Sequence, residues 1–90
     1  MGNRGNTAAR EFEKLAQDRA RELGESAART NIARMIGADY TAYVKAVNGT
    51  RPVSLDLVCD WIDAWNAAAG DTLRVRIGGA VAVERRSADG

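Results

Sequence analysis

The chain has 90 residues, of which 46% are hydrophobic and 28% charged, and its formal net charge is +1. This length suits one domain with a modest core and leaves no room for a second domain that senses a ligand, so we expect no cofactor and no small-molecule ligand. A single cysteine and the absence of histidine exclude an internal disulfide and the usual zinc sites, and no apolar run is long enough to span a membrane.

The N-terminal part of the sequence predicts a flexible arm followed by an amphipathic helix. Residues 1–7 contain glycines and asparagines without periodicity, so we expect a mobile arm that carries Arg4 and ends at a capping Thr7. From residue 8 to residue 23, Phe12, Leu15 and Ala16 recur at helical spacing, and Gly24 marks the end of this helix. We expect this helix to begin the folded domain, which extends over residues 8–70.

Two short helices are predicted next. Thr30 or Asn31 is a suitable cap for the first, which ends at Gly37, and Asp39 is a suitable cap for the second, which spans residues 40–48 and ends at Gly49. Two short helices joined by a turn that contains glycine are typical of a helix-turn-helix. The sequence therefore predicts this motif at residues 30–49.

A fourth helix and a hairpin complete the prediction. The helix begins at a capping Ser54 and ends at Gly70, and apolar residues cover more than half of its circumference. Apolar and polar residues then alternate on both sides of a Gly-Gly pair, which predicts a β-hairpin at residues 71–86. Residues 87–90 have no apolar content, and we expect a disordered tail there. The fold class is mainly α, with four helices followed by a short C-terminal hairpin.

The stretch NIARMIGADYTAYVKAVNGTRPVSLDLVCDWIDA resembles the lambda-repressor/Cro-like helix-turn-helix family over residues 30–64. Ala33 stands where the family keeps a small residue, Gly37 follows at the turn, and Gly49 precedes a segment similar to the family's loop and fourth helix. The sequence departs from the family at Tyr43 and Ala46, where aliphatic residues are usual, and at the start of the second helix, which lacks the common glutamine. The resemblance implies binding of double-stranded DNA through the third helix.

Helical geometry then selects the candidate contacts. If Tyr43 and Ala46 face the core, the opposite side of the third helix faces the DNA groove, and it supplies the candidate base contacts Thr41, Val44, Lys45 and Asn48. Polar and basic residues around the motif are candidates for the DNA backbone: Arg29, Thr30, Asn31, Tyr40, Thr50 and Arg51. The alternative is that these residues are ordinary solvent-exposed side chains on a packing helix.

Helix four offers other candidate sites. Asp56, Asp60 and Asp63 share one face, but without a nearby histidine or nucleophile we interpret them as a solvated face and expect neither a metal site nor an enzyme. Cys59 is interpreted as a small core residue. The wide apolar face predicts that the chain forms a homodimer, and the candidate dimerisation residues are Trp61, Trp65, Leu73, Val75 and Ile77. The hairpin could lie on helix four, pair across a two-fold axis, or do both.

We therefore expect a sequence-specific transcriptional regulator, similar to a phage or prophage Cro-like immunity repressor, that occupies operator DNA in the cytoplasm of a bacterium and associates with its nucleoid. One alternative is an antitoxin-type module that binds another protein through the apolar face and the hairpin. Another is an excisionase-like protein that bends DNA, in which the hairpin is a wing and Arg74 and Arg76 contact phosphates.

Overall fold

A computed structural model describes residues 3–86 of the chain. Four helices are followed by one antiparallel hairpin, which confirms the expected fold class. The elements are α1 (Arg4–Glu22), α2 (Arg29–Met35), α3 (Tyr40–Asn48), α4 (Leu55–Ala69), β1 (Leu73–Ile77) and β2 (Val81–Arg85). The disordered tail predicted for residues 87–90 lies outside the described residues.

Helix α1 begins at Arg4, so the prediction of a flexible arm over residues 1–7 is wrong from residue 3 onward. Asn3 and Asn6 form a capping box in which each side chain accepts a hydrogen bond from the other's backbone N–H. Asn6 is fully buried, and its amide nitrogen donates to the carbonyl oxygens of Ala46, at 2.7 Å, and Arg51, at 2.9 Å. These bonds fix the first turn of α1 against the end of α3.

The helix ends show which capping predictions hold. Asp39 caps α3 and Ser54 caps α4, and both helices end at a glycine in the left-handed region, with φ of 77° at Gly49 and 61° at Gly70. Helix α2 begins one residue before Thr30, after Ala28, which has no capping side chain. Thr30 and Asn31 are therefore helical residues, and the prediction that either caps α2 is wrong.

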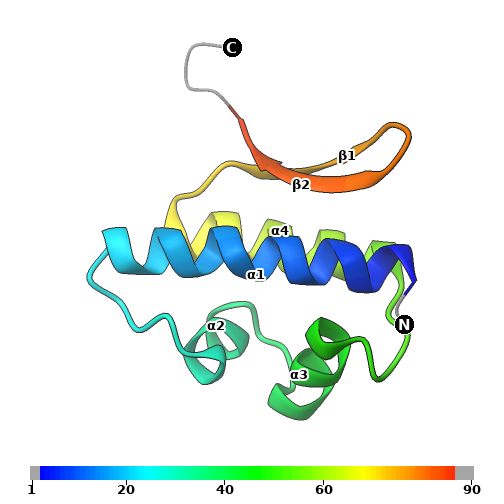
Figure 1. Ribbon diagram of the computed structural model, residues 1–90. Coiled ribbons are helices and arrows are strands. Elements are labelled where there is room, and N and C mark those ends of the chain that lie inside the picture. Colours follow the sequence, from blue (N-terminus) through cyan, green and yellow to red (C-terminus); the bar gives the residue numbers. More distant parts are fainter. Residues whose placement is uncertain (1–2, 87–90) are drawn as a thin grey trace.

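The elements form three layers (Figure 1). Helices α1 and α4 run side by side in the middle, α2 and α3 lie on one side of this pair, and the hairpin lies on the other. Strand β2 packs on α1 and β1 packs on α4. Apolar side chains from all six elements meet in one core around α1. The hairpin thus covers its own chain, on the side remote from α3.

The core accounts for most of the wide apolar face of α4. The Trp65 side chain is fully buried and packs edge-on against Phe12 of α1, with 6.0 Å between ring centroids, and Trp61 packs against Tyr43 of α3. Leu73 is also buried, with 4% of its surface exposed. Trp61, Trp65 and Leu73 are therefore not available as dimerisation residues, because α1, α3 and the hairpin already cover them. Val75 and Ile77 keep part of their surface exposed.

Candidate DNA interface

Helices α2 and α3 are the two short helices at which the helix-turn-helix is predicted. A four-residue connection, residues 36–39, joins them, and Gly37 within it has a φ of 69° that favours glycine. The N–H of Ala38 donates to the carbonyl oxygen of Ala33 at 2.9 Å and so closes the end of α2. The small side chain of Ala33, which is 1% exposed, lies inside the core with Ile32.

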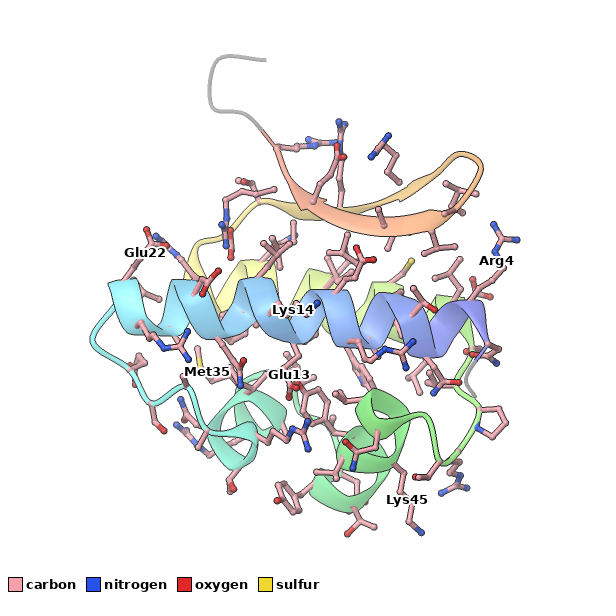
Figure 2. The ribbon with its side chains drawn as sticks, in the orientation of Figure 1. Arg4, Glu13, Lys14, Glu22, Met35 and Lys45 are labelled. Atoms are coloured by element: carbon pink, nitrogen blue, oxygen red, sulfur yellow. The ribbon has the colours of Figure 1, made fainter. Side chains whose placement is uncertain are left out.

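One side of α3 is buried as expected. Tyr43 is 0% exposed and Ala46 is 2% exposed, so both side chains face the core. On the opposite side Thr41, Lys45 and Asn48 are exposed, and Figure 2 shows Lys45 extending away from α1. Val44 differs from the expectation of an outward side chain, because it is half-buried and packs against the core. Three of the four candidate base contacts therefore lie on an open surface.

A buried carboxylate holds both helices of the motif on α1. The Glu13 Oε1 atom accepts hydrogen bonds from the Tyr43 hydroxyl at 3.0 Å and from Arg29 Nε at 3.0 Å, and in Figure 2 Glu13 points from α1 toward α2 and α3. Burial, together with the negative charge of Glu13, raises the pKa of the Tyr43 hydroxyl far above its ordinary value, so this group remains a hydrogen-bond donor. Arg29 is thus partly engaged inside the protein.

The remaining candidate backbone contacts are at the two ends of the motif. Thr30, Tyr40, Thr50 and Arg51 are exposed, whereas Asn31 is half-buried and its side chain donates to the Ser26 carbonyl oxygen at 2.8 Å. The Thr50 hydroxyl donates to the Lys45 carbonyl oxygen at 3.4 Å, beyond the end of α3. The exposed residues are free to contact a ligand, while Asn31 serves the start of α2.

Much of the positive charge on this face forms no ion pair within residues 3–86. In the described part of the sequence, Arg34, Lys45 and Arg51 take part in no ion pair, although Arg34 donates a hydrogen bond to Asn31. The nearest carboxylate along the motif is Asp39, whose side chain accepts from the N–H of Ala42 as the cap of α3. An exposed surface with unpaired cations on both helices suits a polyanionic ligand.

Sequence reasoning missed three residues of this region. Arg34 adds an exposed cation, and Asn6 and Glu13 position the motif from α1. Glu13 had a detectable signal, because it lies four residues after Ala9 and three before Ala16, within the apolar stripe of its helix. Asn6 gave only the local signal of two asparagines at capping-box spacing.

The acidic face of α4 shows no comparable site. Asp56, Asp60 and Asp63 are exposed, and no group of three or more potential ligand residues within 3–86 lies close enough to hold a metal ion. Cys59 is half-buried, and its burial and these three carboxylates raise the pKa of its thiol, which makes it a poor nucleophile.

Within residues 3–86, every helix is too short or too polar to cross a bilayer.

A comparison of this chain with known protein families, with curated proteins and with solved structures finds no match.

Proposed function

We propose that this protein is a sequence-specific DNA-binding regulator of transcription that inserts α3 into the major groove of an operator. The observation that carries the proposal is the arrangement of α3, whose Tyr43 side is anchored in the core and whose Thr41, Lys45 and Asn48 side is open. The attraction to phosphates would come from Arg34, Lys45 and Arg51, which form no ion pair within residues 3–86. As such a regulator it would act on the nucleoid, in the cytoplasm of a bacterium.

The roles of the side chains follow from their chemistry. Lys45, near the middle of the exposed side, can donate to guanine acceptors, and Asn48 can pair with adenine or hold a phosphate at the end of the helix. Thr41 and Thr50 offer hydroxyl groups, and Arg51 follows the motif where a DNA strand would pass. Bound protein would act by occupancy, because it competes with polymerase for the promoter.

A binding selection from random duplex DNA, followed by titration of the selected site at several salt concentrations, tests the proposal. Affinity should fall by orders of magnitude between about 50 and about 200 mM salt, because several phosphate contacts release counterions. Arg51→Ala should weaken binding to all sequences alike and reduce the salt slope by about one. Arg86→Ala, which removes an exposed arginine at the end of the hairpin, is the matched control and should change neither quantity.

The base sequence recovered by the selection reports on base contacts. Lys45→Ala should change the preferred bases at one or two positions, at a cost of about 1 to 3 kcal/mol per lost contact. Val44→Ala, the substitution at the half-buried candidate, should change the base preference less than Lys45→Ala does. It should lower the free energy of unfolding more. Binding that is insensitive to salt, or a motif unchanged by Lys45→Ala, would argue against this function.

A further inference from the structure

Strand β1 has an open edge. In an antiparallel pair every second residue turns its N–H and C=O away from the partner strand. Leu73 does so, because its N–H donates to the Asn66 side-chain oxygen at 2.9 Å and its C=O accepts from the Asn66 amide at 2.9 Å. By this alternation Val75 and Ile77 also direct their backbone groups outward, and no hydrogen bond from residues 3–86 reaches those groups.

The two edges of the hairpin differ. On β2 the outward N–H of Val83 donates to the Glu11 carboxylate at 3.0 Å, and α1 runs alongside. On β1 the Asn66 side chain imitates a neighbouring strand at Leu73 only, and the edge beyond it is uncovered. An uncovered edge of this kind is a template for pairing with another extended chain.

A groove lies beside the open edge, between β1 and α4. It has a volume of about 470 Å³, and its lining includes the apolar Ile62 and Val75 together with polar residues, among them Asp63. Farther along the strand, Ile77 is 58% exposed on the same side of the hairpin as Val75. An added strand would therefore find apolar contacts on its inner face where it passes Val75 and Ile77.

The outer face of the hairpin is basic. Arg74 and Arg76 both pair with Glu84, each at 2.7 Å, and Arg86 is exposed without an ion pair in the described part of the chain. The pKa of the Glu84 carboxyl is lowered by the hydrogen bond from Arg74, so it is fully ionised, but it carries one charge against two. The other face of an added strand would meet this positive excess.

We propose that the β1 edge binds an extended segment of a partner protein, in which acidic and apolar side chains alternate. Backbone groups of Val75 and Ile77 would hold the segment, the groove would receive its apolar residues, and Arg74 and Arg76 would face its carboxylates. A second copy of this chain fits less well in the register that uses Val75 and Ile77 of both copies. Pairing Val75 with Ile77 of a second β1 places Arg76 opposite Arg76, and like charges directly opposite are destabilising. The proposal is independent of DNA binding, because α3 lies on the other side of the molecule.

The test uses the full chain, labelled with ¹⁵N, and a short capped peptide of alternating glutamate and valine. NMR titration should shift the amide signals of Val75 and Ile77 and slow their hydrogen exchange at least about tenfold. A peptide of alternating lysine and valine should bind at least about tenfold more weakly. Absence of a response at both amides, or equal binding of the two peptides, overturns the proposal.

Two variants separate the contribution of the backbone hydrogen bonds to peptide binding from the contribution of the arginine charges. Ile77→Pro removes one outward N–H that forms no hydrogen bond with β2, so it should abolish peptide binding while the circular dichroism spectrum stays unchanged. Arg76→Glu should reverse the preference in favour of the lysine peptide, and Arg10→Glu should leave it unaltered. Light scattering tests the alternative that a second copy of this chain occupies the edge. A dimer that dissociates when Ile77 is replaced by proline would show that it does, and would overturn the proposal.

Discussion

At the scale of single residues, Tyr43 shows why an aromatic side chain stands where an aliphatic one was expected from the sequence. An aliphatic side chain there could fill the core but could not serve the buried Glu13 carboxylate, which accepts from the Tyr43 hydroxyl at 3.0 Å. The ring also packs on Trp61, with 5.5 Å between centroids. Glu13 and Tyr43 therefore depend on each other, because each satisfies a buried polar group of the other.

This dependence predicts non-additive effects on stability. Glu13→Leu leaves the Tyr43 hydroxyl buried without its acceptor and should cost about 1 to 3 kcal/mol or more in the free energy of unfolding. Adding Tyr43→Phe to Glu13→Leu should recover part of that loss, since both polar partners are then replaced by apolar groups. Urea denaturation of the two single variants and the double variant measures the coupling.

Tyr40→Phe is the control for these three variants. The Tyr40 side chain is 49% exposed, and its hydroxyl makes no hydrogen bond in residues 3–86. It should leave the free energy of unfolding nearly unchanged. If the costs of Glu13→Leu and Tyr43→Phe simply add, the two groups do not act as a pair.

At the scale of elements, Asp71 joins the last helix to the hairpin. Its carboxylate accepts from Trp65 Nε1 at 3.0 Å and from Arg85 Nε at 2.7 Å, and it also accepts from the N–H of Thr72 at 2.8 Å. Burial alone would raise the pKa of Asp71, but these hydrogen bonds outweigh it and lower the pKa to about 2. One side chain thus connects α4 with β2 and with Thr72, the residue before β1.

The lowered pKa predicts a loss of stability in acid. Because the folded-state pKa lies below the unfolded value of about 3.9, the carboxylate stabilises the fold above that value, and the contribution is lost as the pH falls toward about 2. Asp71→Asn should therefore be less stable than the natural chain at neutral pH, and the difference should shrink between about pH 5 and about pH 2. Thermal melts across this range measure it. A difference that stays constant with pH would mean that ionisation of Asp71 contributes nothing.

Local signals account for most of what the sequence predicts at this scale. Asp39, Gly49, Ser54 and Gly70 act within a few residues of their own helix end, so the bounds of α3 and α4 follow directly from the sequence. The start of α1 also has a local signal, the two asparagines of its capping box. The long-range partners of Asn6 lie 40 and 45 residues away in the chain, and no local pattern reports such contacts.

Three residues of the expected dimer surface, Trp61, Trp65 and Leu73, are buried within the chain for a related reason. A wide apolar face on α4 shows that more than one layer covers the helix, but not whether that layer belongs to the same chain. In the structure α1 covers Trp65, and α3 covers Trp61. The candidate base contacts were easier to predict, because once Tyr43 and Ala46 are inside, the period of the helix places Thr41, Lys45 and Asn48 outside.

At the scale of the whole molecule, the layer of α1 and α4 separates two surfaces of different character. The helix-turn-helix lies on one side, and the hairpin with Arg74 and Arg76 lies on the other (Figure 1). A helix with its side chains is about 10 Å across, so a straight duplex seated on α3 does not reach the outer face of the hairpin. This arrangement disfavours the interpretation of the hairpin as a wing.

Changes to the hairpin should therefore leave DNA binding intact. Replacing both Arg74 and Arg76 by alanine should alter the affinity for the selected operator by less than about twofold and leave the salt slope unchanged, because neither guanidinium displaces a counterion from a phosphate. Arg51→Ala, measured in parallel, should lower the slope by about one. Saturation with the glutamate–valine peptide should likewise leave the DNA affinity as it is, since the two ligands occupy opposite sides. A slope reduced by about two in the hairpin variant would instead place both arginines on phosphates, and the duplex would then have to bend around the molecule to reach them.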